Sequence, residues 1–146
     1  MTYNYTEKEM VLEYCKILEK KNVTFAVEVP FYNRSIDLVY LDKEGNTCAV
    51  EFKLNNWKKA IDQAKDCTTG AHFVYICVPN KNYSLQLKEE VEKAGCGLII
   101  FDPSKKNSSI LNECKNENFW SGAHELLKKG FTYSVENNNY KQLMSL

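Results

Sequence analysis

Residues 35–63 read SIDLVYLDKEGNTCAVEFKLNNWKKAIDQ, from Ser35 to Gln63, and predict two strands joined by a short turn and followed by a helix from about Asn56. Three charged residues, Asp37, Glu51 and Lys53, lie within otherwise apolar strand sequence. Burying a charged side chain without a partner is costly. These three side chains therefore need partners, which makes them the first candidates for a functional site.

The turn of this hairpin fixes which residues face each other. Lys43–Gly45 fits a three-residue loop with Gly45 in the left-handed position. Residues equally far from Glu44 along the two strands are then opposed, and Asp37 and Glu51 meet this condition. Directly opposed residues have Cβ atoms about 4.5–5.5 Å apart. We therefore expect two carboxylates to meet on one face of the hairpin.

Lys53 follows Glu51 by two positions, so its amine is expected on the same face, while Val50, Phe52 and Leu54 line the other. Two carboxylates so close repel each other unless a cation lies between them. Mg²⁺ is commonly held by one or two carboxylates together with water. Such a metal lowers the pKa of bound water and stabilises charge on a phosphoryl group. The pattern predicts a metal site for phosphate chemistry, with Lys53 beside the attacking water.

Asp37 followed by Glu51-Phe52-Lys53 resembles the PD-(D/E)XK nuclease superfamily, which includes restriction endonucleases and Holliday-junction resolvases. The resemblance extends over roughly Thr6 to Pro103, and Ile36 stands in place of the proline that names the motif. It implies a restriction-endonuclease-like αβββαβ core, and cleavage of phosphodiester bonds, with DNA as the expected substrate and Mg²⁺ or Mn²⁺ as cofactor.

The same resemblance assigns roles to individual residues. Asp37 and Glu51 would bind the metal, the main-chain carbonyl of Phe52 would complete its shell, and Lys53 would act on the water. Glu7, at the start of the first helix, would assist as a metal or water ligand. The alternative for the strand residues is a set of structural charges satisfied by backbone donors or salt bridges.

Several of the candidate residues have both a functional and a structural interpretation. Gln63 matches a glutamine that some relatives direct at the site, but glutamine is also an ordinary surface residue of helices. Lys58 and Lys59, with help from Arg34, would contact nucleic-acid phosphates, although a lysine pair is also typical of a solvated helix face. The acid of Glu7 would be favoured in a first helical turn in any case, because of the helix dipole.

Composition limits the class of protein. The chain has 146 residues, of which 44% are hydrophobic and 26% charged, as expected for one globular domain. No long apolar run and no signal peptide are visible, so we expect a cytoplasmic protein without a membrane span. The net charge of zero argues against tight binding of long duplexes, although a local basic patch would suffice. Six cysteines without a C-x-x-C pair are expected to be reduced, structural thiols.

Periodicity gives the order of the elements. A capping box at Thr6 and Glu9 begins a helix that is expected to run from Glu7 to Lys20. The later elements are a strand over 23–31, the hairpin, a helix ending at Gly70, a strand over 71–78, a helix over 84–94 and a strand over 98–101. This order predicts an α/β fold with a central mixed sheet: an antiparallel meander, then parallel strands reached by right-handed crossovers.

The C-terminal part is harder to interpret. We divide the chain into a core, 1–103, and an extension, 104–146, with residues 104–109 as a polar connector. A helix is expected from Phe119 to Lys129, ended by Gly130, and then a loop over 136–139. The extension could pack on the core, form a homodimer interface or touch substrate. An inactive nuclease-fold binding module is the alternative function.

Overall fold

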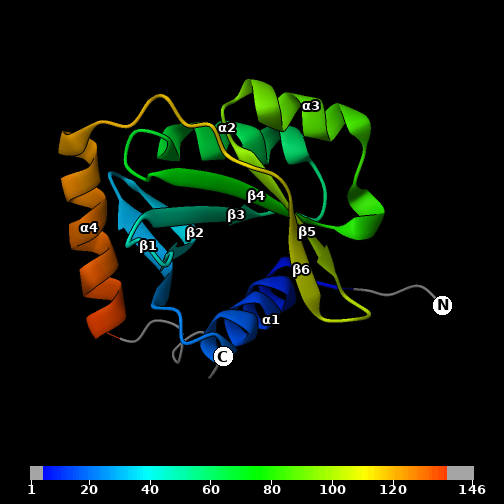
Figure 1. The fold of residues 1–146 in the computed structure, drawn as a ribbon, viewed down its shortest axis with the longest axis horizontal. Coiled ribbons are helices and arrows are strands. Elements are labelled where there is room, and N and C mark those ends of the chain that lie inside the picture. The colour runs from blue at the N-terminus through cyan, green and yellow to red at the C-terminus, as the bar shows by residue number, and fades with distance from the viewer. Residues whose placement is uncertain (1–4, 138–146) are drawn as a thin grey trace.

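The computed structural model describes residues 5–137 and contains one mixed sheet with helices on both faces (Figure 1). The elements are α1 (Glu7–Lys20), β1 (Phe25–Phe31), β2 (Arg34–Leu41), β3 (Thr47–Phe52), α2 (Trp57–Cys67), β4 (Phe73–Pro79), the 3₁₀ turn η1 (Asn80–Asn82), α3 (Leu85–Lys93), β5 (Gly97–Asp102), β6 (Asn107–Asn112) and α4 (Ser121–Glu136).

The six strands lie side by side in chain order, from β1 to β6. β1, β2 and β3 form an antiparallel meander, β3, β4 and β5 are parallel, and β6 returns antiparallel to β5. The α2 and α3 helices make the two crossovers, and both cover the same face of the sheet (Figure 1). The predicted α/β class, mixed sheet and αβββαβ order are confirmed.

The β2–β3 turn has the predicted geometry. Gly45 has a φ of 81°, and its N–H donates to the carbonyl of Asp42 at 3.0 Å. The Asp42 carboxylate fixes the turn by accepting from the N–H groups of Glu44 and Asn46 at 3.0 and 2.8 Å. The resulting register pairs Leu38 with Val50, as expected for a hairpin centred on Glu44.

Two apolar layers cover the two faces of the sheet. On one face, α1 packs its buried side chains against those of β3 and β4; the main contributors are Met10, Tyr14, Leu18, Val50, Phe52 and Tyr75. On the other face, α2, α3 and α4 pack against the sheet; the main contributors are Ala60, Ala64, Val74, Ile76, Leu87 and Leu127. Val50 and Phe52 therefore share one face, as predicted, and this face is covered by α1, whereas Glu51 between them faces α2.

The expectation that residues 104–109 form a connector is wrong, because β6 begins within this segment, at Asn107. The strand has one neighbour, β5, and most of its side chains are exposed. A strand at the edge of a sheet does not need the apolar alternation that identifies a strand in the sequence. The sheet thus continues beyond Pro103.

The last helix starts and ends later than expected. It runs from Ser121 to Glu136 and passes through Gly130, which was expected to end it. A Cβ at Gly130 would collide with the main-chain carbonyl of Pro30 on β1, so the glycine allows α4 to lie against this strand. Phe119 and Trp120 precede the helix and are partly exposed, as is Leu126. Of the loop expected over 136–139, residues 138 and 139 lie outside the described residues.

All six cysteines are buried and free, as predicted. Among the helices of residues 5–137, none has the length and apolar character needed to cross a membrane. The expectations of a cytoplasmic location and of a homodimer stay predictions.

Candidate functional site

The regular alternation of side chains breaks where β1 and β2 pass each other at Glu28 and Asp37. Val27 packs in the α1 layer, but Val29 packs in the opposite layer, although residues two apart in a strand normally share a face. Glu28 between them has a φ of 50°, a conformation that non-glycine residues rarely adopt. Strain of this kind is often found at functional positions.

This break lets Asp37 reach the end of β3. Its Oδ2 atom accepts a hydrogen bond from the N–H of Phe52 at 2.9 Å. Ile36 and Leu38, on either side of Asp37, pack in opposite layers, as the two valines do on β1. The Asp37 carboxylate is therefore held at the point where β3 ends and Lys53 follows.

Asp37 and Glu51 bring their carboxyl groups into contact, as the hairpin register predicts. Glu51 is only 2% exposed, and burial, together with the negative charge of Asp37, raises its pKa to about 8. Burial also raises the pKa of Asp37, against the effect of the hydrogen bond from Phe52. A protonated Glu51 can donate to Asp37, and this hydrogen bond lowers the pKa of Asp37, so the two acids titrate as a coupled pair.

Arg34 is the cation that faces Glu51. Its guanidinium donates to Glu51 Oε1 at 3.0 Å, to Asp66 Oδ2 at 3.2 Å and to the main-chain carbonyl of Gln63 at 2.9 Å. One side chain from β2 thus joins β3 to α2. Both terminal nitrogens of the Arg34 guanidinium therefore bind groups of the protein itself. The expected contact of Arg34 with phosphate stays a prediction.

Glu7 and Lys53 meet on the α1 side. The Thr6 hydroxyl accepts from the N–H of Glu9 at 3.0 Å, the predicted cap, and so fixes the first turn of α1. Glu7 in this turn accepts from the N–H of Leu54 at 3.2 Å through Oε2, and its Oε1 lies 4.0 Å from Lys53 Nζ. The charges of Glu7 and Lys53 are close enough to act on Asp37. Lys53 thus lies on the α1 side whereas Glu51 faces α2, so the expectation that the two side chains share one face is wrong. The strand ends at Phe52, and its alternation of side chains does not extend to Lys53.

A small cavity of about 220 Å³ opens beside Asp37. It is lined by Glu7, Lys8, Val11, Glu28, Asp37 and Phe52. Three of these residues are acids, and one of them, Glu28, was not predicted because it looks like an ordinary exposed position of an alternating strand. Glu51 does not line the cavity, because it points to the α2 side.

The oxygen atoms of these carboxyl groups are ligands that suit a hard divalent cation, but few of them lie close to one another. Within residues 5–137, no group of three or more His, Cys, Asp and Glu side chains is arranged to hold a metal ion. Mg²⁺ needs only one or two carboxylates, since water supplies most of its remaining ligands. The carboxyl groups of Asp37 and Glu51, which are in contact with each other, fit this modest requirement.

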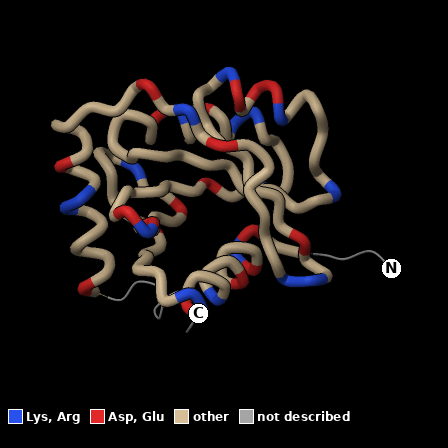
Figure 2. Tube along the Cα trace, in the orientation of Figure 1, with Lys and Arg blue, Asp and Glu red and all other residues tan. Residues whose placement is uncertain are grey.

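The remaining predicted residues lie farther from the acid pair or contact it indirectly. Gln63 meets Arg34 through its main-chain carbonyl, and its side chain is half-buried. Lys58 and Lys59 are exposed in the first turn of α2, with Lys58 Nζ 5.9 Å from the centre of the Trp57 ring. Figure 2 shows Lys and Arg interspersed with Asp and Glu along the chain rather than gathered in one basic stripe.

Two contacts could not be anticipated from the sequence. The thiol of Cys67 on α2 lies 3.7 Å from Glu51 Oε1, and Asn82 Nδ2 donates to the main-chain carbonyl of Leu54. Cys67 ends α2 and Asn82 ends η1. Both elements are brought close to β3 and to the residues that follow it only by the fold of the chain around the sheet. The spacing of residues along the chain carries no signal for them.

No protein-family model matches the chain, and no curated protein matches it in sequence. Solved structures do match. SPO1766, a protein of unknown function from Silicibacter pomeroyi, aligns with a TM-score of 0.66 and 14% identity over 93% of this chain and 90% of its own. An XisH family protein from Nostoc punctiforme aligns with a TM-score of 0.51 and 19% identity over 72% of this chain and 98% of its own.

A repair endonuclease from Pyrococcus abyssi also aligns with the chain, over 70% of this chain and 50% of its own, with a TM-score of 0.46 and 20% identity. At such identities a similarity concerns the fold. The chain therefore shares the architecture of the SPO1766 and XisH structures, and its chemistry has to be argued from its own side chains.

Proposed function

We propose that this protein is a divalent-metal-dependent nuclease that hydrolyses phosphodiester bonds, with DNA as its substrate. The observation that carries the proposal is the contact between the half-buried carboxyl group of Asp37 and the buried carboxyl group of Glu51, near the point where β3 ends and Lys53 follows. When two carboxyl groups share a buried site, the pKa of one of them is strongly raised unless a cation neutralises the pair, as it is here for Glu51. A metal ion beside this pair would offset that cost.

The residues of this chain have distinct tasks in the proposal. Asp37, Glu51 and the Phe52 carbonyl would hold Mg²⁺ or Mn²⁺, with Glu7 as a further ligand through water. The bound ion would supply Lewis-acid stabilisation of phosphoryl charge and a more acidic water. Lys53 would place its ammonium beside the reacting phosphate. Glu7 supports this placement, because its carboxylate lies 4.0 Å from Lys53 Nζ.

The proposed phosphate contacts lie outside this group. Lys58 and Lys59 would bind the nucleic-acid backbone from the start of α2, where both side chains are exposed. Because the chain has no net charge and its lysines are interspersed with acids, we expect modest affinity for nucleic acid and, with few phosphate contacts, a shallow decrease of that affinity as salt rises. The XisH similarity is one of fold at 19% identity, so the proposal rests on the site residues instead.

Cleavage of labelled DNA tests the proposal. Single-stranded, duplex and branched substrates, and an RNA, are incubated with the protein in Mg²⁺, in Mn²⁺ and in a chelator. We expect cleavage only with metal, and a loss of at least about 100-fold in Asp37→Asn, Glu51→Gln and Lys53→Met, as is common when a charged group acts in the transition state. Glu89→Gln, an exposed acid on α3, is the matched control and should cleave normally.

Equal cleavage by Lys53→Met and the parent protein would refute the assigned role of Lys53. Cleavage that persists in all three variants would indicate a contaminating nuclease and would count against the whole proposal.

One observation favours a second function, a binding module without catalytic activity. Arg34 already places a cation on Glu51, at 3.0 Å, as in a purely structural ion pair. Thermal melting separates the two functions. A metal present at about 100 times its Kd would stabilise a binding site by about 2.7 kcal/mol. An inactive relic should melt at the same temperature with Mg²⁺, with Mn²⁺ or with a chelator.

A further inference from the structure

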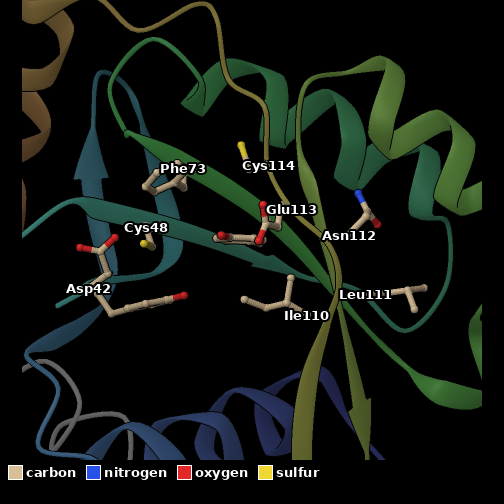
Figure 3. Close-up of a pocket in the computed structure, with 10 residues that line it drawn as sticks. Asp42, Cys48, Phe73, Ile110, Leu111, Asn112, Glu113 and Cys114 are labelled. Carbon is tan, nitrogen blue, oxygen red and sulfur yellow. The ribbon is translucent and has the colours of Figure 1, made fainter. Parts of the chain in front are cut away.

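A second and larger cavity, of about 580 Å³, lies at the opposite end of β3 from the acid pair (Figure 3). It is formed by residues from β2, β3, β4 and β6 and by the segment that follows β6. Its lining comprises Tyr40, Asp42, Cys48, Phe73, Tyr75, Ile110, Leu111, Asn112, Glu113 and Cys114. The proposed nuclease chemistry uses none of these residues.

Three aromatic rings reach this cavity because of the register of the sheet. Tyr40 is the partner of Cys48 across β2 and β3, and Cys48 is the partner of Phe73 across β3 and β4. Tyr75 follows two positions after Phe73, so its ring lies on the same face. The cavity is thus bounded by a row of side chains running across three strands.

Gly97 on β5 makes room for one of these rings. A Cβ at this position would lie 2.6 Å from two atoms of the Tyr75 ring, so a larger residue would displace the ring. Tyr75 itself is only 7% exposed. Its pKa is raised, mainly by burial and to a smaller extent by neighbouring groups that include Glu113 and Asp42, so the phenol stays neutral.

The charges around the cavity have one sign. Two of its lining residues, Asp42 and Glu113, are acids, and none of the described lining residues is Lys, Arg or His. Asp42 keeps its charge in place by accepting hydrogen bonds from the β2–β3 turn. Glu113 is exposed and makes no hydrogen bond or ion pair with another described residue. In Figure 3 it lies near the middle of the lining residues, while Ile110 points toward the cavity and Leu111 points away.

We propose that this cavity binds an organic cation, an ammonium or guanidinium group carried on an apolar stem. Cations are attracted to the faces of aromatic rings, and cages of such rings are used to recognise ammonium ligands. Glu113 would pair with the charged group, Tyr40, Phe73 and Tyr75 would surround it, and Ile110 would cover the stem. The same acids would repel a phosphate, so the site is distinct from the proposed nuclease site and does not depend on it.

Titration of the full chain with butylguanidinium and butylammonium tests this proposal. Binding is followed by calorimetry and by backbone amide chemical shifts. We expect saturable shifts at Cys48, Phe73 and Tyr75, weaker binding at higher salt, and no binding of the neutral isostere butylurea. Glu113→Gln should weaken binding by about tenfold, since a charge-assisted pair is lost.

Phe73→Leu keeps the apolar surface but removes a ring, and it should also weaken binding. Glu89→Gln, on the far face of the sheet, is the matched control. The proposal is overturned if butylurea binds as tightly as butylguanidinium, if Glu113→Gln binds like the parent protein, or if no cation binds.

The source of the cation is decided by a second titration, with a short peptide that contains arginine and the same peptide with citrulline. Tighter binding of the arginine peptide than of butylguanidinium would support a basic side chain of a protein partner. Binding of the peptide no tighter than the small cation would support a free amine or guanidine metabolite. In both cases the cavity binds the same kind of charged group, an ammonium or guanidinium.

Discussion

Arg34 determines how much net charge the acid pair leaves inside the protein. The carboxyl groups of Asp37 and Glu51 are in contact, so the two acids do not readily ionise together, and the guanidinium 3.0 Å from Glu51 favours the ionised form of the pair. The ion pair and the raised pKa of Glu51 are therefore compatible, because the proton belongs to the pair rather than to one acid.

This balance predicts the effect of removing the guanidinium. Arg34→Met leaves a buried acid without its partner, and it should lower the free energy of unfolding by about 3 kcal/mol, at the low end for a buried pair because the Arg34 side chain is 21% exposed. In the Glu51→Gln background, the loss caused by Arg34→Met should be at least halved, because the acid that the guanidinium faces at 3.0 Å is then absent and the remaining charge lies on the half-buried Asp37. Urea unfolding in a chelator is measured for the parent protein, for Arg34→Met, for Glu51→Gln and for the double variant.

Asp66→Asn is the control for this cycle, because it removes a partner of the same guanidinium that is 70% exposed. Exposed ion pairs contribute little, so its effect should stay below about 1 kcal/mol. Additive losses in the double variant would contradict the proposed balance of charge.

The sequence was sufficient to pair Asp37 with Glu51, because a three-residue turn with Gly45 leaves one register. It was not sufficient to place Arg34. A basic residue beside a turn is usually solvated, and the partners of Arg34 come from β3 and α2, which are brought to it only by the crossover. The same limit applies to the contact between Cys67 and Glu51.

At the scale of elements, Gly130 is where the sequence and the structure differ most. A glycine after an apolar helical stripe commonly ends a helix. Here α4 continues to Glu136 and buries Leu127 and Phe131 on either side of the glycine, because the missing side chain admits the Pro30 carbonyl.

Gly130→Ala should therefore destabilise the protein by about 1–3 kcal/mol, as overpacking does, although alanine favours the helix itself. Gly122→Ala, in the same helix, is the control. Its Cβ would meet the ring of Trp120, an exposed side chain that can move, so stability should change by no more than about 0.5 kcal/mol. Equal effects of the two substitutions, measured by thermal melting, would contradict the close packing of α4 on β1.

The elements that the sequence predicts correctly are those with one face buried in the protein. The central strands and the helices α1, α2 and α3 each have a buried face, whose period identifies them. β6, an edge strand with Ile110 and Leu111 exposed, has no such face. β6 is held by its main-chain pairing with β5, and this pairing leaves no apolar pattern among the side chains of β6.

At the scale of the molecule, two groups on different parts of the sheet should make stability depend on pH in opposite ways. The pKa of Glu51 is raised to about 8, mainly by burial. His72 directly precedes β4, and its pKa is lowered by burial and by the nearby His124. The His72 Nδ1 atom accepts from the N–H of Thr47 at 3.0 Å, which requires that nitrogen to be unprotonated.

The signs follow from which state binds more protons. Between its ordinary pKa and about 8, Glu51 is protonated in the folded chain but not in the unfolded one, so its contribution to stability is lost as pH rises through this range. Below the ordinary pKa of histidine, the unfolded chain protonates His72 more readily, so stability is lost as pH falls. The two effects act at opposite ends of the accessible range.

Urea unfolding from pH 5 to pH 9 in a chelator, on the parent protein and two variants, separates these effects. Glu51→Gln should gain stability relative to the parent as pH rises toward 9, because the parent must ionise a buried acid there. His72→Gln should gain relative to the parent as pH falls toward 5, since the amide oxygen can still accept from Thr47. A difference from the parent that stays constant with pH, in either variant, would show that the group does not titrate differently in the folded and unfolded chains. For Glu51, that result would also remove the physical reason for placing a cation beside the acid pair.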